Sequence, residues 1–448
     1  MRWLNAAVLA AVPCFAVSLA ACGTTVDSSS TNATSSSTGT QMGTGGSENT
    51  GGSESTGGAA QGGGEQGGTT STGMGGVAYP APHPPAPQVQ KTGTLVMTAQ
   101  KIQPVFFQND DAAFVAQIED FTSKIGTSTY FPDAAGEYGV GMPTVLAPIQ
   151  LTEDAPSSLS DDQIQTWLIS KIEAGDGVFP AADDQTIYVL FYPSGVTISD
   201  FGGTSCQSFG GYHFNTNLHD GSNAIYAVIP RCQGGQGVTA MDLVTQATSH
   251  ELLEAATDPL PETQPTYGSL DDAHFYWELV VGAEVGDLCS LSPSGYSSLS
   301  DMPYSVQRIW SNEAAAASHD PCAPSPSGEV YFNAAPELND DVTIFGPDGS
   351  VTMKGVTIKV GETKTIDVDL FSDGPTDAWS VQAYDAQELF GGSPDLDLSL
   401  DKETGKNGDK LKLTIKPLHQ AQYGLATFVL YSMKGKQMNP WVGLVHTK

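Results

Sequence analysis

Between residues 90 and 325 the apolar positions follow two different periods, which predict strands and helices in alternation. From Phe114 to Ile125 apolar side chains recur at helical spacing, so a helix is expected over 110–125. The uninterrupted apolar run Thr186–Tyr192 predicts a strand buried on both faces of a sheet. Further strands are expected at Thr94–Thr98, Ile102–Phe107, Val145–Ile149 and Ala224–Ile229, and further helices over 161–174 and 239–257. This alternation predicts an α/β domain over 90–325, with a mostly parallel or mixed sheet.

The pattern changes after residue 325, and the stretch 290–325 before it is expected to be irregular. Short alternating runs separated by Gly, Pro and Asp predict strands at Val342–Phe345, Val356–Val360, Thr365–Leu370, Trp379–Ala383, Leu396–Leu400, Leu411–Ile415 and Ala426–Tyr431. About seven strands at this spacing predict an all-β, Ig-like sandwich over 326–448. The segments 361–365 and 410–415 resemble bacterial Ig-like or BACON-type modules, which often bind glycans or act as spacers. Trp379 and Trp441 are candidate sugar platforms, with burial in the sandwich as the alternative.

Two segments precede the folded part. Arg2, the apolar run 6–21 and the sequence Leu19–Cys22 resemble the signal peptide and lipobox of bacterial lipoproteins over residues 1–22, which implies a lipid on Cys22. Residues 23–89 are rich in Gly, Ser and Thr and end in a Pro-rich piece, so a disordered linker is expected. The expected location is the cell envelope, where the lipid would attach the exported chain to a membrane.

The net charge of the chain argues against two classes of binding partner. The 448 residues carry 50 acidic and 18 basic side chains, a net charge of -32. Nucleic-acid binding needs Lys and Arg to displace phosphate counterions, so no nucleic-acid partner is expected. The same balance argues against electrostatic binding to anionic lipid. After residue 22 no apolar run is long enough to span a bilayer.

Four cysteines remain once Cys14, in the signal segment, and Cys22 are set aside. An even number in an exported chain indicates disulfides, and four cysteines allow three pairings. We favour Cys206–Cys232 and Cys289–Cys322 because each pair closes a short loop within one region. A cysteine metal site is disfavoured because the sequence has no C-x-x-C pair.

The sequence Ser249–Glu254 carries the sharpest chemical signal. On a helix, His250 and Glu254 are one turn apart and share a face, so both can bind one metal ion. Glu251 lies beside them, where it can act as general base on the attacking water. The segment resembles the H-E-x-x-H helix of zinc metallopeptidases, with Glu254 in place of the second His. One divalent ion is therefore expected, zinc first, although a carboxylate ligand leaves room for other metals.

A third ligand is expected from the segment Glu284–Cys289. Gluzincin peptidases use a downstream Glu as ligand and a following Asp to orient the site, which implies these roles for Glu284 and Asp287. The gap between the two residues is one shorter than is usual there, so Asp287 as the ligand stays an alternative. His213, in a Gly-rich turn, is a further candidate ligand, and Asp258 is a candidate for orienting His250.

These motifs together resemble one family. Ser249–Pro259 and Glu284–Cys289, with Gly211–His213 and Tyr226–Pro230 upstream and Val306–Asn312 downstream, resemble the phosphate-induced, EXORDIUM-like proteins and their bacterial relatives. The resemblance covers about residues 95–322. It implies a secreted protein associated with a wall or matrix, and supports a zincin-like α/β fold with a mixed sheet and an active-site helix. It implies no settled reaction.

Two functions follow from these observations. The first is a lipid-anchored extracellular metal-dependent hydrolase, a zincin-like peptidase with Glu251 as general base. The alternative is a non-catalytic surface, matrix or glycan-binding protein with a structural metal site. Retention of Glu251 favours the enzyme, because a structural site needs no free base. Glu254 in place of His favours the alternative.

Overall fold

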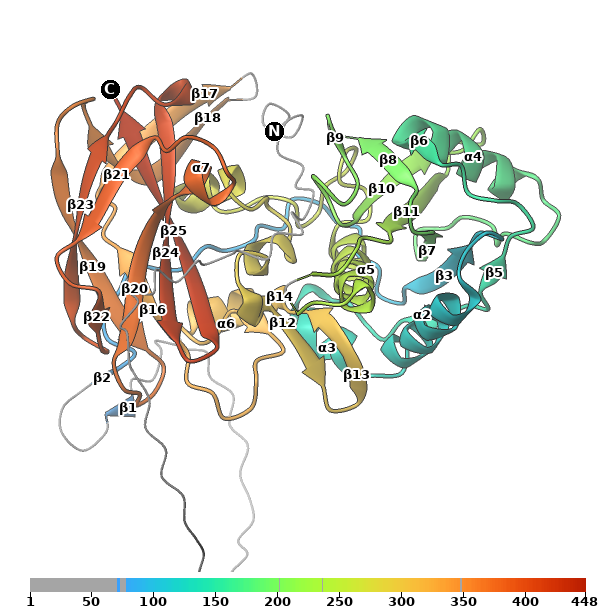
Figure 1. Ribbon diagram of the computed structural model, residues 1–448, viewed down its shortest axis with the longest axis horizontal. Helices are drawn as coiled ribbons and strands as arrows, with labels where there is room; N and C mark the ends of the chain where they lie inside the picture. The colour runs from blue at the N-terminus through green and yellow to red at the C-terminus, as the bar shows by residue number, and fades with distance from the viewer. Residues whose placement is uncertain (1–70, 73–77, 201, 236, 347–348) are drawn as a thin grey trace, which may run out of the picture. The chain divides into compact units, whose positions relative to one another are not determined.

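The computed structural model describes residues 71–72, 78–200, 202–235, 237–346 and 349–448 (Figure 1). The expected signal peptide with Cys22, and the expected linker up to residue 70, lie outside the described residues. Among the helices of the described part, none is both long and apolar enough to cross a membrane.

The first sheet is built around the strand that the continuous apolar run predicts. β7 spans Thr186–Tyr192 and is buried along its whole length. The order of the strands is β10-β11-β7-β3-β4, and β5 also pairs with β3. The bounds of the other strands are β3 Lys101–Phe106, β4 Thr144–Val145, β5 Ile149–Gln150, β10 Tyr212–Asn217 and β11 Asn223–Pro230. Only the β10–β11 pair in this sheet is antiparallel, so the expected mixed, mostly parallel sheet is confirmed.

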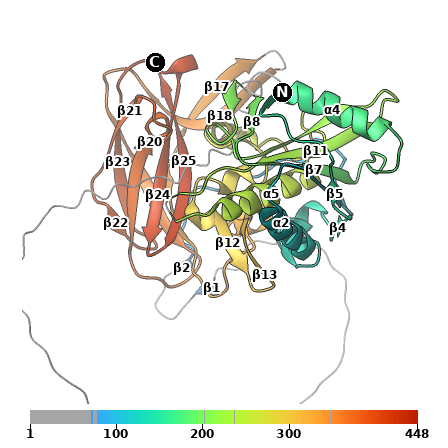
Figure 2. The same ribbon diagram turned by 45° about the vertical axis from the view of Figure 1, so that its right-hand side comes forward.

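Helices cover both faces of this sheet (Figure 2). Successive side chains of a strand point to opposite faces. Val189 and Phe191 of β7 therefore join the apolar cluster of the helices on one face, and Tyr188 and Leu190 join that of the helix on the other. The helices on the first face are α2 Ala112–Ile125 and α5 Ala240–Thr257, and the helix on the second face is α4 Asp161–Glu173.

Local signals set where α5 begins and ends. The Thr239 side chain accepts a hydrogen bond from the Asp242 N–H at 3.0 Å, and the Thr239 N–H donates to the Asp242 carboxylate at 2.9 Å. Such a reciprocal cap stabilises the first turn of a helix. The helix ends at Thr257, and its C-cap residue Asp258 directly precedes Pro259. These caps place the Ser249–Glu254 motif in the second half of α5.

Several stretches differ from their predicted structures, and the expected strand Val145–Ile149 is divided into the short strands β4 and β5. Residues 94–98 form no strand, because Met97 packs against α5 and its N–H donates to Ala256 O at 2.8 Å. The stretch 290–325, expected to be irregular, contains a hairpin and a further strand pair. The elements in and around these stretches are α3 Tyr130–Ala135, β12 Tyr296–Leu299, β13 Met302–Gln307, β14 Ile309–Trp310, α6 Asn312–Ala316 and β15 Cys322–Ala323. A smaller sheet holds β6 Ser158–Ser160, β8 Thr197–Asp200 and β9 Gly203–Thr204.

Residues after 325 form two further sheets, ordered β16-β19-β23-β21 and β17-β18-β25-β24-β20-β22. Every pair in them is antiparallel except β18–β25. Phe332 of the first sheet and Trp379 of the second pack with ring centroids 5.1 Å apart. The bounds are β16 Phe332–Pro336, β17 Asp340–Gly346, β18 Gly349–Ile358, β19 Lys364–Ser372, β20 Trp379–Asp385, α7 Ala386–Leu389, β21 Leu396–Leu400, β22 Thr404–Gly405, β23 Lys410–Pro417, β24 Leu425–Lys434 and β25 Gln437–Thr447.

The structure decides whether Trp379 and Trp441 are sugar platforms or buried residues of the sandwich. Trp379 is 2% exposed and Trp441 is 3% exposed. A sugar platform needs an open ring face, so neither side chain can serve as one. The expected boundary at residue 325 lies between β15 and β16. The domain boundaries and the Ig-like assignment of residues 326–448 stay predictions.

Residues 78–89 belong with the folded part rather than with the expected linker. β2 Ala78–Tyr79 pairs with β1 Ser71–Thr72. The His83 ring stacks on Phe371 with centroids 3.5 Å apart, and Val89 is buried in a bridge to Leu270. Ordering this Pro-rich piece loses little entropy because proline already restricts the backbone, which explains why its few apolar side chains suffice.

Candidate metal centre

Helix α5 presents its motif to the interior. His250, Glu251 and Glu254 are each at most 2% exposed. The one-turn spacing brings His250 Nε2 within 2.9 Å of Glu254 Oε2. The two residues expected to share a metal ion therefore do face each other.

Gln307 of β13 holds the ring of His250. The Gln307 side chain donates from Nε2 to Gly286 O at 2.5 Å, so its Oε1 faces His250 Nδ1 at 3.0 Å. An amide oxygen only accepts, so Nδ1 carries the proton and the lone pair of the neutral ring is on Nε2. This is the arrangement by which metal-ligating histidines are usually fixed. No role was predicted for Gln307, although it lies inside the segment Val306–Asn312 that contributes to the family resemblance.

Glu254 has one oxygen held and one left for the centre. Its Oε1 accepts the N–H groups of Gly286 and Asp287, both at 3.1 Å. A Cβ at position 286 would lie 2.6 Å from His250 Nδ1 and 2.7 Å from Glu254 Oε1, so only glycine fits there. The Glu254 carboxylate is thereby oriented with Oε2 toward the histidine.

Glu284 and Asp287, the two candidates for the third ligand, lie near different histidines. Asp287, in η3 Asp287–Cys289, has Oδ1 3.9 Å from His250 Nε2. Glu284 has Oε1 3.6 Å from the Nε2 of His213 instead. The structure thus groups Asp287, the alternative ligand, with His250 and Glu254. The disulfide Cys289–Cys322, with a Cα–Cα distance of 5.9 Å, ties η3 to β15.

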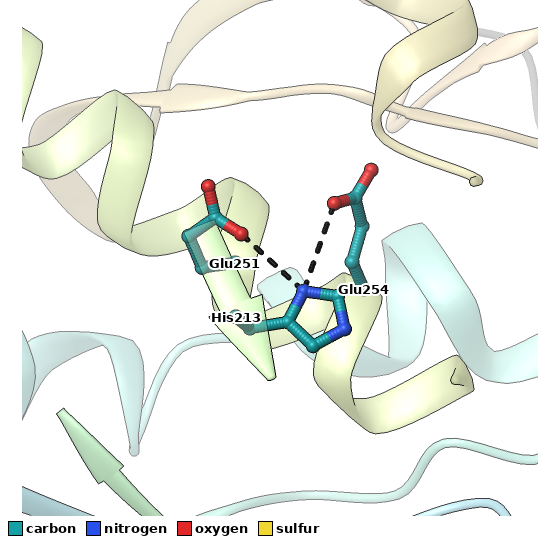
Figure 3. Close-up of side chains that lie close together, drawn as sticks. All are labelled: His213, Glu251 and Glu254. Atoms are coloured by element: carbon teal, nitrogen blue, oxygen red, sulfur yellow. Dashed lines mark hydrogen bonds and ion pairs between the residues drawn. The ribbon is translucent and has the colours of Figure 1, made fainter. Parts of the chain in front are cut away.

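His213 enters the centre from the edge strand β10, not from the Gly-rich turn in which it was expected (Figure 3). Its Nδ1 lies 3.3 Å from Glu251 Oε2 and 4.0 Å from Glu254 Oε2. Its Nε2 lies 3.2 Å from the backbone O of Asp258, which can only accept. The neutral ring therefore directs its Nδ1 lone pair at the two glutamates. The carboxylate of Asp258 accepts a hydrogen bond from the Thr266 N–H at 2.8 Å. It forms no hydrogen bond with His250, whose Nδ1 faces Gln307 instead. The prediction that Asp258 orients His250 is therefore wrong.

The pocket holds more negative than positive charge. Two imidazoles face the buried or nearly buried carboxylates of Glu251, Glu254, Asp258, Glu284 and Asp287. Burial, followed by the charge of Glu254, holds the pKa of Glu284 and of Asp287 well above its usual range. Burial lowers the pKa of His250, but the charges of Glu254 and Glu251 outweigh it and raise this pKa to about 10. Such a pocket needs protons or a cation to offset its charge.

The donor set suits a divalent cation. Among the described residues, two groups have ligand atoms that all lie within 4.8 Å of one another: His213, Glu251 and Glu254, and His250, Glu254 and Asp287. Glu284 Oε1 is buried without a hydrogen-bond partner. Mixed imidazole and carboxylate ligands are those that zinc and manganese accept.

The centre is largely enclosed. Glu284 has the most exposed of the paired side chains, at 14%, followed by Asp287 at 7%. The pocket around Trp277, Trp310 and Trp441 is lined by none of the ligand candidates. Any path for a substrate would therefore enter on the side of Glu284.

The disulfides are the pairs that the sequence favoured, Cys206–Cys232 and Cys289–Cys322. Disulfides persist in oxidising compartments, so they indicate an exported or extracellular protein.

Comparisons with known proteins identify no family. No family model and no curated protein matches the chain. Among solved structures, a chimeric titin Z1Z2 and the titin M3 domain each cover 21% of this chain, with 16% and 6% identity and TM-scores of 0.15. The chain covers 85% and 88% of those two structures. A FixG-related protein from Vibrio parahaemolyticus matches 27% of this chain, and the match covers 96% of that protein's own length. The identity is 9% and the TM-score is 0.17. Scores this low carry no argument about fold or function.

Proposed function

We propose that this chain is an exported metalloprotein whose centre binds a divalent cation, zinc first, and hydrolyses a carbonyl substrate such as a peptide. The observation that supports it is the enclosure of His250, Glu254 and Asp287 with the pre-oriented Nε2 of His250 between the two carboxylates. When bound, the cation would act as a Lewis acid and lower the pKa of water.

The side chains around these ligands suit hydrolysis. Glu251 Oε1 is 4.0 Å from His250 Nε2, next to the place where the ligand atoms converge. From there Glu251 would take the proton of the attacking water as general base. His213 in its protonated form, which donates from Nε2 to the carbonyl of Asp258, would orient Glu251 by donating from Nδ1 across the 3.3 Å contact.

Several further parts of the proposal rest on the sequence. They are a zincin-like fold, membership of the EXORDIUM-like family, an Ig-like sandwich and a lipid on Cys22 that anchors the chain in the cell envelope. A peptide substrate is favoured over a glycan ligand, because Trp379 and Trp441 are buried. Replacement of Cys22 by Ser should release the protein from membranes; retention after a carbonate wash would contradict the anchor.

The enclosure of the centre favours a second candidate, a non-catalytic protein whose ion stabilises the fold. Structural zinc sites are closed, whereas catalytic ones keep a position open for water or substrate. In this case Glu251 would serve only to offset charge.

The two candidates separate in one experiment. Glu251→Gln, at one equivalent of zinc, should retain the ion and lose hydrolysis of a peptide library by about 10²–10⁴-fold, because only the base is removed. Glu119→Gln on α2 is the matched control, and it should leave the rate unchanged. A zinc-loaded wild type without activity, and no difference from Glu251→Gln, would favour the non-catalytic protein.

A further inference from the structure

The two histidines of the centre are arranged alike. One ring nitrogen of each faces an oxygen that only accepts: His250 Nδ1 faces Gln307 Oε1 at 3.0 Å, and His213 Nε2 faces Asp258 O at 3.2 Å. The other nitrogen of each then carries the lone pair of the neutral ring. Both of these nitrogens face Glu254 Oε2, at 2.9 Å and 4.0 Å. Two imidazoles are thus prepared as ligands, although the proposed function uses only one.

The carboxylates divide in the same way. Glu251 lies with His213, as Figure 3 shows, and Asp287 lies with His250. Glu254 alone belongs to both groups. Because Glu254 Oε1 is occupied by two N–H groups, the shared ligand atom is Oε2.

We propose that His213, Glu251 and Glu254 bind a second divalent cation beside the ion at His250, Glu254 and Asp287. This inference rests on the proposed function for the first ion only. While the second ion is bound, Glu251 is a ligand and cannot accept a proton. Excess divalent metal should therefore lower hydrolysis.

The test counts ions in the full chain saturated with zinc, by metal analysis after removal of free metal. Wild type should bind two. His213→Gln and His250→Gln should each bind one, because each removes a ligand of a different group. Glu254→Gln should bind none, because its oxygen is shared. His219→Gln is the matched control, since His219 is 85% exposed, and it should still bind two.

The test distinguishes failure of the second site from failure of the proposed function. One ion in the wild type, lost in both histidine variants, would mean a single ion held by both rings; it would overturn the second site and leave the proposed function standing. No ion in the wild type would overturn both. If Glu254→Gln does not fold, the double variant His213→Gln, His250→Gln replaces it, and one or more ions retained there would overturn the proposal.

Discussion

The C-terminal sheets bury a carboxylate that three backbone N–H groups satisfy, whereas the centre at α5 in the α/β region buries one with an oxygen that has no hydrogen-bond partner. Asp385 in the sheets is 2% exposed, and its carboxylate accepts the N–H groups of Glu388, Asp395 and Leu396 at 3.0–3.1 Å. In the centre at α5, Glu284 Oε1 has no hydrogen-bond partner, and its pKa is raised by burial and then by Glu254. A buried carboxylate with donors is part of the fold. Carboxylates that face one another indicate a ligand.

The two regions also differ in how their acidic side chains pair with Lys and Arg. In the C-terminal sheets lysines pair with acids at the surface, as Lys354 does with Asp341 at 2.6 Å, with both side chains more than half exposed. In the centre, no Lys or Arg among the described residues forms an ion pair with the ligand candidates. The C-terminal sheets should therefore depend on apolar packing, and the α/β region should depend in addition on its disulfides and on the proposed cation.

The largest effect is expected from a cavity in the C-terminal sheets. Trp379→Ala removes an indole that packs on Phe332, and should lower the free energy of unfolding by about 3–5 kcal/mol. Urea denaturation measures it. Tyr423→Ala is the control, because Tyr423 is 82% exposed, and should change little. A loss below about 1 kcal/mol for Trp379→Ala would show that these sheets do not depend on their core.

Removing a disulfide should act on the α/β region alone. Cys206 and Cys232 are 26 residues apart, so replacing both with Ser should lower the free energy of unfolding by about 3 kcal/mol. Hydrogen exchange should rise in β10 and β11 and stay unchanged in β24 and β25. Equal increases in both regions would contradict the division drawn above.

Metal removal should have a slightly smaller effect. At zinc one hundredfold above its Kd, chelation should lower the free energy of unfolding by about 2.7 kcal/mol, because the ion binds only the folded chain. The Trp379→Ala variant should show the same decrease, since distant effects add. Thermal unfolding with and without chelator measures both, and an unchanged midpoint in the wild type would count against the cation.

The smallest effect is expected at the surface of the C-terminal sheets. Lys354→Ala breaks an exposed ion pair and should change the free energy of unfolding by less than about 1 kcal/mol. High salt should reduce even that difference. A loss of several kcal/mol at Lys354 would mean that surface charge, not packing, stabilises these sheets.

The sequence alone determined the features that depend on neighbours along the chain. The apolar run of β7, the extent of α5 and the one-turn spacing of His250 and Glu254 are local patterns, and each appears in the structure as predicted. Both disulfide pairs also followed from short loops. Local patterns suffice here because backbone hydrogen bonds and helical spacing act over a few residues.

Only the tertiary structure decided which side chains meet. His213 reaches the centre because β10 pairs with β11 at the sheet edge, and Gln307 because β13 packs along α5. The choice between Glu284 and Asp287 depends on how the loop before η3 packs, which no spacing reveals. The burial of Trp379 and the docking of residues 78–89 likewise depend on contacts between segments far apart in the chain. Such contacts are set by packing of the whole fold, because their free energy comes from burial of surfaces that the local sequence does not contain.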